Sequence, residues 1–192
     1  MSADENRVLC CGENPFIRLS ATDGGPETTI ASYWRNVMSP AGPGHVLYLK
    51  SELTGDKWRI WSDNIAMTRW LQETIQGMLI PELADLNLPV EEAMFEKDGD
   101  PHRFYTEYVT SEDTSLSMTW HDLGDPLMIH TQPGTGAGER PYGVNTVLIP
   151  ASGTRLVMDG SQAAGQSWKR DRDGRPFSTS ALAFCESWTE AR

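Results

Sequence analysis

The chain has 192 residues, enough to bury one full core and too few for two domains of ordinary size. Its formal net charge of −11 repels phosphate backbones and anionic lipids, which argues against nucleic-acid and membrane partners. The sequence contains no run of 18 apolar residues and no basic or apolar leader at residues 1–5, so we expect a cytoplasmic protein.

Residues 1–44 carry the weakest periodicity in the chain. Breakers at Gly24-Gly25-Pro26 and at residues 40–44 flank a short apolar stretch, and we expect a partly irregular N-terminal arm. Phe16 and Tyr33-Trp34 supply apolar area with which this arm packs on the rest of the protein. Cys10, Cys11 and Cys185 have neither disulfide-framework nor Cys-x-x-Cys spacing, which predicts free thiols.

From residue 45 to 192 the sequence predicts a single domain of short strands separated by turns. Residues 46–53 and 58–61 read as a hairpin across Thr54–Lys57. Residues 92–96 and 103–109 read as a second hairpin, in which Asp98-Gly99 supplies the positive φ angles of a tight turn.

One segment, at about 63–80, predicts a helix. Asp63-Asn64 can cap its N-terminus, and Pro81 and Pro89 bound its end. Its apolar residues recur at spacings of three and four, typical of a helix that buries one stripe: Met67, Trp70, Leu71, Ile75 and Met78.

Residues 115–121 alternate without a break. Leu116, Met118 and Trp120 share one face of the predicted strand, while His121 lies on the polar face with Ser115, Ser117 and Thr119. Further strands are expected at 127–130, 144–149, 155–158 and 178–188. The turns between these strands are expected at 122–126, 150–153 and 159–160. The whole chain is therefore expected to have nine or ten strands.

Connections of two to six residues force neighbouring strands to pair antiparallel. We therefore predict a mainly β protein, an antiparallel up-and-down β-barrel of nine or ten strands with one α-helix, because closure removes the exposed edges of a long meander. A two-sheet β-sandwich is the alternative. The outline is similar to the lipocalin-like or calycin-like barrels, but the Gly-x-Trp of their opening strand is absent and the helix follows the second predicted strand.

Four histidines are candidates for acid–base chemistry, and none belongs to a metal-binding motif, so no metal or cofactor is expected: His45, His102, His121 and His130. His121 is the best candidate for a general acid or base, because it lies where a strand meets its loop. Glu107 and Glu186 are its candidate partners, since each is a carboxylate within a strand. Arg59 and Arg155 are alternative, purely structural partners for these carboxylates.

The seven tryptophans favour a binding cavity for a small hydrophobic or aromatic molecule. Its expected contacts are Trp58, Arg59, Trp61, Trp120, Arg140 and Tyr142. Residues 132–143 lack the Lys-Ser/Thr of a phosphate loop and read as a flap over the cavity. Three functions follow: a small-molecule-binding barrel, a cofactor-independent isomerase, lyase or hydrolase that uses a His/Glu pair, or a non-catalytic subunit that docks on a partner protein, with a homodimer left open.

Overall fold

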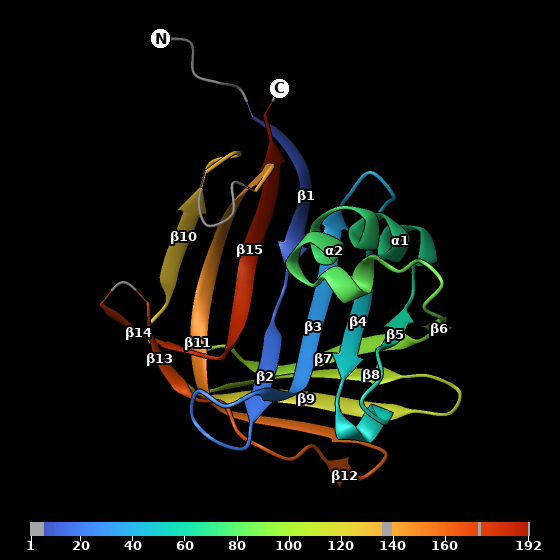
Figure 1. Ribbon diagram of the computed structural model, residues 1–192, viewed down its shortest axis with the longest axis vertical. Helices are drawn as coiled ribbons and strands as arrows, with labels where there is room; N and C mark the ends of the chain where they lie inside the picture. Colours follow the sequence, from blue (N-terminus) through green and yellow to red (C-terminus); the bar gives the residue numbers. More distant parts are fainter. Residues whose placement is uncertain (1–5, 136–139, 173, 192) are drawn as a thin grey trace.

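The computed structural model describes residues 6–135, 140–172 and 174–191. The protein is mainly β, with one large mixed sheet of 13 strands and a separate two-stranded hairpin (Figure 1). The main strand order is β6-β5-β4-β3-β1-β15-β11-β9-β8-β7, while β2, β10 and β12 pair beside this path. Every pair is antiparallel except β5 with β6.

The first strands and the helices form the N-terminal half of the chain. The elements here are β1 (Arg7–Glu13), β2 (Phe16–Ser20), β3 (Glu27–Met38), β4 (Gly44–Lys50), β5 (Arg59–Ser62), α1 (Ile65–Glu73), α2 (Ile75–Leu79) and β6 (Val90–Glu92), with 3-10 turns at Glu52–Thr54 and Pro81–Ala84. The remaining strands are β7 (Met94–Asp100), β8 (Phe104–Thr110), β9 (Ser115–Leu123), β10 (Leu127–Thr131), β11 (Tyr142–Met158), β12 (Ser161–Gln162), β13 (Lys169–Arg172), β14 (Arg175–Ser178) and β15 (Ser180–Glu190).

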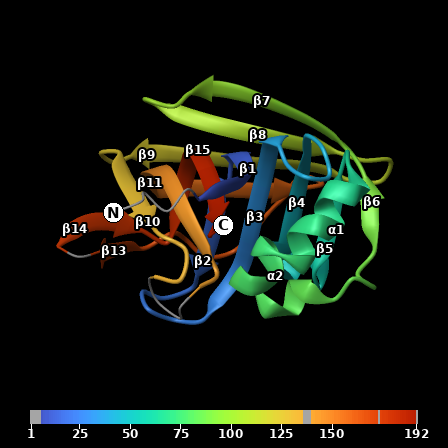
Figure 2. The same cartoon turned by 90° about the horizontal axis from the view of Figure 1, so that it is seen from above.

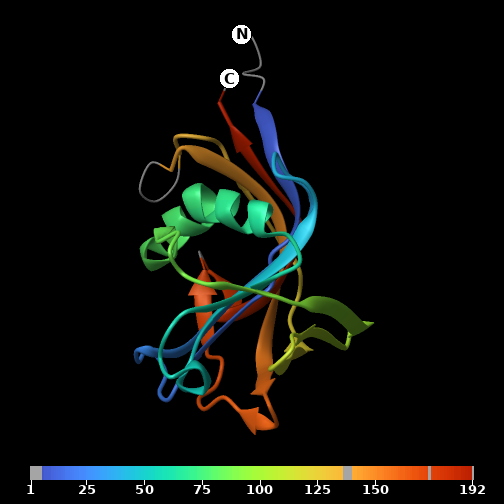
Figure 3. The same ribbon diagram turned by 90° about the vertical axis from the view of Figure 1, so that its right-hand side faces the viewer.

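The sheet folds over itself, so that strands β7–β9 cross the strands β1 to β5 and β15. Viewed from above, helices α1 and α2 cover one face of the upright strands and β7–β9 lie against the other (Figure 2). The side view shows the same three layers, with the helices and the β7–β8 hairpin on opposite sides (Figure 3). The molecule therefore has two interfaces to fill, one on each face of the upright strands.

The strand β11 makes the corner between the upright and the crossing strands. Its first part pairs with β10 and β15 and its second part with β9, so β9 and β10 follow one edge of β11 in succession. Leu123 of β9 pairs with Ala151, and Leu127 of β10 pairs with Leu148. The segment between Leu123 and Leu127 is one residue longer than the segment of β11 opposite it, which makes a bulge. The turns expected at 122–126 and 150–153 are therefore wrong, because Pro126 and Pro150 lie at this bulge and bend rather than at chain reversals.

Two apolar clusters fill the two interfaces. The one inside the folded sheet joins Tyr33, Leu47 and Trp61 to the crossing strands through Met118 and Trp120, all nearly inaccessible to solvent. The other packs the helices against the outer face of β3, β4 and β5, and includes Trp34, Val46, Tyr48, Ile60, Met67, Leu71, Ile75 and Trp188. Burial of large side chains in two separate layers explains why tryptophan is frequent in this chain.

Several predicted elements are confirmed, although the helix is split. The segment at 63–80 forms α1 and α2, which meet at Thr74, and the Asn64 side chain caps α1 by accepting a hydrogen bond from Met67 N at 3.0 Å. The two predicted hairpins form as β4–β5 and β7–β8. The turn expected at Asp98-Gly99 is wrong, because β7 and β8 stay paired as far as Asp100↔Phe104 and the chain reverses at residues 101–103. Residues 115–121 lie in β9 with alternate burial, and the three cysteines are free thiols.

The irregular arm expected at residues 1–44 is wrong for the described part of that segment. Residues 7–38 form β1, β2 and β3, and β3 lies between β1 and β4 in the main sheet. Because β3 is buried on both faces, its polar and apolar residues do not alternate as they do in a half-buried strand.

The strand path has two ends, β6 and β7, so the pairings among the described residues leave the predicted barrel without ring closure. The structure has more strands than the nine or ten expected, because the strands within residues 7–38 and several short strands were not predicted from the sequence. Among the described residues, no helix has both the length and the apolar character needed to cross a bilayer.

Candidate functional site

Glu107 lies inside the folded sheet, fully buried on β8. Both of its carboxylate oxygens contact Nη2 of Arg35 from β3, at 2.8 and 2.9 Å. Burial raises the pKa of Glu107 to about 7, and the positive charge of Arg35 and hydrogen bonds from Tyr33 and Tyr105 oppose that rise. Glu107 is thus an interior carboxylate with a structural partner, but that partner is Arg35 and neither Arg59 nor Arg155.

Arg35 is the centre of this buried network. Its Nη1 donates to Glu13 Oε2 at 2.8 Å and lies 3.2 Å from the hydroxyl of Tyr105, and its Nη2 lies 3.2 Å from the hydroxyl of Tyr33. Burial also raises the pKa of both tyrosines, so their hydroxyls stay protonated at neutral pH. The four terminal N–H groups of the guanidinium are therefore committed to protein acceptors.

His121 does not meet Glu107. The strand register pairs Glu107 with Met118 and Phe104 with His121, so the two predicted catalytic side chains point to opposite faces of β8 and β9. His121 is 45% exposed, its Nδ1 lies 3.0 Å from Asp122 Oδ2, and its ring covers Gly153. The predicted acid–base pair of His121 and Glu107 is therefore not assembled.

Glu186 is buried on the opposite side of the sheet from Leu182 and Phe184, although all three lie at alternate positions of β15. Cys185 adopts φ 53° and the pairing of β15 with β11 shifts register there, which marks a bulge. Leu182 and Phe184 therefore pack inside the folded sheet, whereas Trp188 packs under the helices and donates Nε1–H to Glu186 Oε1 at 2.7 Å. Simple alternation along the strand at 178–188 would put Leu182, Phe184, Glu186 and Trp188 on one face, but the bulge at Cys185 exchanges the two faces between Phe184 and Glu186.

The predicted ligand contacts are dispersed. Trp61 and Trp120 belong to the core inside the folded sheet, and Trp120 Nε1 donates to Phe16 O at 3.0 Å. Arg59 pairs with Glu91 at 2.8 Å, Trp58 Nε1 lies 3.3 Å from Glu82, and Tyr142 packs near the helices. Arg140 is exposed beside residues 136–139 of the expected flap, which lie outside the described part of the chain.

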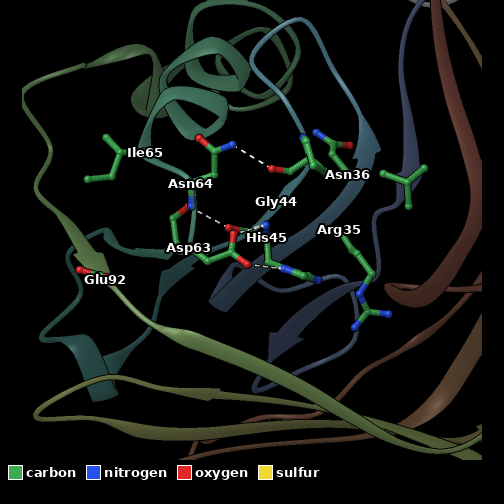
Figure 4. Close-up of a pocket in the computed structure, with 11 residues that line it drawn as sticks. Arg35, Asn36, Gly44, His45, Asp63, Asn64, Ile65 and Glu92 are labelled. Carbon is green, nitrogen blue, oxygen red and sulfur yellow. Dashed lines mark hydrogen bonds and ion pairs between the residues drawn. The ribbon is translucent and has the colours of Figure 1, made fainter.

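A cleft of about 870 Å³ opens where β3 and β5 end and β4 and α1 begin (Figure 4). Of the residues considered for the site from the sequence, only His45, one of the four candidate histidines, is among the described residues that line it: Arg35, Asn36, Val37, Pro43, Gly44, His45, Ser62, Asp63, Asn64, Ile65 and Glu92. Arg35 and His45 are register partners on β3 and β4, so the cleft adjoins the buried network around Glu107. Asn36 is only 3% exposed, and its amide nitrogen and oxygen have no hydrogen-bond partner in the described structure.

His45 and Asp63 form a closely held pair in this cleft. Asp63 Oδ1 accepts the backbone N–H of His45 and Oδ2 lies beside its Nδ1, both at 2.6 Å. Because a carboxylate only accepts, Nδ1 carries the proton, and in the neutral form of the ring Nε2 then presents a lone pair. The ring also stacks on Phe95, with centroids 5.2 Å apart, and Figure 4 shows it between Asp63 and Arg35.

This pair was missed because His45 reads as an exposed residue after a Gly-Pro loop. The signal lay in the predicted hairpin: once Val46 pairs with Ser62, His45 and Asp63 come opposite each other at the end of the ladder. The sequence of the connection does not specify that register, because β4 and β5 are joined by a segment that contains a 3-10 turn at Glu52–Thr54 and not by a tight two-residue hairpin turn. In the part of the chain that the structure describes, no group of three or more His, Cys, Asp or Glu side chains could hold a metal ion.

Comparison of this chain with models of protein families, with curated proteins and with solved structures finds no match.

Proposed function

We propose that the protein binds a small molecule in the cleft formed by β3, β4, β5 and the start of α1. The ligand would have a polar group and an apolar body. The observation that carries this proposal is the His45–Asp63 pair, an imidazole fixed in orientation and tautomer at the wall of an 870 Å³ cleft. Small-molecule sites are typically clefts of about 300–1,000 Å³ with a few well-placed polar groups.

The apolar body would lie on Val37 and Ile65. Both side chains line the cleft and both are more than half exposed, at 65% and 54%. Single exposed apolar residues are ordinary on protein surfaces, but two that flank the same cleft offer a ligand apolar area that water now covers. This gives the expected small hydrophobic or aromatic molecule a location outside the filled interior of the sheet.

Acid–base catalysis is the second candidate function, favoured by the lone pair on Nε2 of His45. Asp63 orients the ring and would stabilise the imidazolium that forms when Nε2 accepts a proton. A cofactor-independent isomerase, lyase or hydrolase would need this arrangement, with His45 as the base in the place expected for His121.

A fragment screen by NMR on the ¹⁵N-labelled chain tests the binding proposal. We expect bound fragments to shift the amide resonances of cleft residues in β3, β4 and β5. His45→Ala should weaken the affinity of these fragments about three- to tenfold, which corresponds to the loss of one hydrogen bond. His102→Ala is the matched control, because His102 is exposed outside the cleft and its loss should leave the affinities unchanged. Fragments that bind His45→Ala as tightly as the unmodified chain would contradict the proposal.

Asp63→Asn tests whether the carboxylate sets the tautomer of His45. The asparagine keeps the oxygen that accepts the His45 backbone N–H and turns its NH₂ toward Nδ1, so the ring proton should move from Nδ1 to Nε2. The ¹⁵N shifts of the imidazole report this exchange directly. An Nδ1 proton that persists in Asp63→Asn would remove the basis for His45 as a base.

A further inference from the structure

We infer that the cleft is a site for an organic cation, a protonated amine carried on an apolar body. This inference rests on the proposed binding function and names the class of its ligand. It follows from which polar atoms the cleft still has free.

The free charged groups and the free ring nitrogen of His45 are hydrogen-bond acceptors, while the unpartnered amide of Asn36 adds one donor group and one acceptor of no net charge. With its proton on Nδ1, the neutral His45 ring presents only a lone pair at Nε2. Asp63 adds a carboxylate 37% exposed at the same wall. A ligand group that reaches both must donate hydrogen bonds, and an ammonium group, with several N–H donors and a positive charge, meets that requirement.

Arg35, the one arginine or lysine among the described residues that line the cleft, is not free to hold an anion. Its Nη1 and Nη2 are occupied by Glu13, Glu107 and the hydroxyls of Tyr33 and Tyr105. The two carboxylates also balance its charge, since Glu13 and Glu107 each lie 2.8 Å from it. A ligand carboxylate would therefore meet a guanidinium that is already neutralised.

Glu92 supplies an uncompensated negative charge at the cleft. Its side chain is exposed and has no ion pair or hydrogen bond within the described structure. Figure 4 shows Glu92 on the side of the cleft away from Arg35, with the His45–Asp63 pair between them. The net charge of −11 adds a long-range attraction for cations and a repulsion for anions.

Three matched probes separate the charge of the ligand from its apolar body: 2-phenylethylamine, 2-phenylethanol and 3-phenylpropanoate. NMR titration of the full chain at neutral pH and low salt should give shifts at cleft amides with the amine at least about fivefold tighter than the alcohol, since one screened ion pair contributes about that factor. The carboxylate should bind more weakly than the alcohol. Added salt should reduce the advantage of the amine.

Glu92→Gln should weaken the amine about two- to fivefold and leave the alcohol unchanged. Glu96→Gln, on the exposed face of β7 and outside the cleft lining, is the matched control and should change neither. Equal binding of amine and alcohol in the cleft, or tighter binding of the carboxylate, would overturn the cation inference and leave the binding function standing. No binding by any of the three also overturns it, whereas the fragment screen decides the binding function independently.

Discussion

Replacement of Glu107 by alanine is expected to lower the free energy of unfolding by about 3–5 kcal/mol. The fully buried carboxylate contacts Arg35 through both oxygens, and its removal leaves a guanidinium that is only 13% exposed with one half-buried counter-charge, Glu13. Tyr33 and Tyr105 lose an acceptor in the same step. Urea denaturation followed by tryptophan fluorescence measures the change.

Two controls separate the buried pair from simple loss of volume. Glu13→Ala removes the more exposed partner of Arg35 and should cost about 1 kcal/mol or less, because solvent screens a pair at 23% exposure. The double replacement Glu107→Leu with Arg35→Met removes both charges and should be far milder than Glu107→Ala, since apolar pairs of similar volume often replace buried ion pairs. A double variant as unstable as Glu107→Ala would contradict the importance of the unpaired charge.

The elements with a strong local pattern could be predicted from the sequence. In β9, Leu116, Met118 and Trp120 are buried and alternate with more exposed residues, and α1 carries its apolar stripe at the expected spacing. Both elements have one face on a core and one toward solvent. Local periodicity reports that asymmetry, so the segments at 115–121 and 63–80 are confirmed.

The elements without that asymmetry could not be predicted. The strand β3 is buried from both sides, by the helices and by the crossing strands, so nothing alternates along its centre. The bulges at Pro126 and at Cys185 depend on which strand lies opposite. The local sequence does not distinguish them from turns, because a proline or one inserted residue can occur in either. Pairing between distant segments decides these features.

The candidate site depends on the same long-range information. The sequence marks Glu107 as a carboxylate within a strand, where burial requires a partner, and the structure buries it fully. That partner, Arg35, lies 72 residues away in the segment expected to be irregular. His45 and Asp63 become neighbours only through the register of β4 and β5, so the cleft they line could not be found from motifs.

Glu186 is the buried carboxyl without a cation among its described partners. Its hydrogen bonds come from the indole of Trp188 and the hydroxyl of Thr146, both neutral, and burial raises its pKa from the usual 4.5 to about 7. The same carboxyl, together with burial, raises the pKa of Cys10 to about 12. At pH below 4.5 the group is protonated in the folded and the unfolded chain and has no effect on stability.

Between pH 4.5 and 7 the unfolded chain releases this proton while the folded chain keeps it, so stability falls as pH rises, and above pH 7 the loss is complete at roughly 3 kcal/mol. Glu186→Gln keeps an oxygen for Trp188 Nε1 and cannot ionise. We therefore expect the variant to match the unmodified chain within about 1 kcal/mol near pH 5 and to be more stable by about 2–3 kcal/mol near pH 8. Glu107 titrates in the same range but is present in both proteins, so the difference between their urea-denaturation curves isolates Glu186. Equal stability of the two proteins near pH 8 would mean that Glu186 ionises in the folded state without cost, and that an additional positive group or water reaches it beneath the helices.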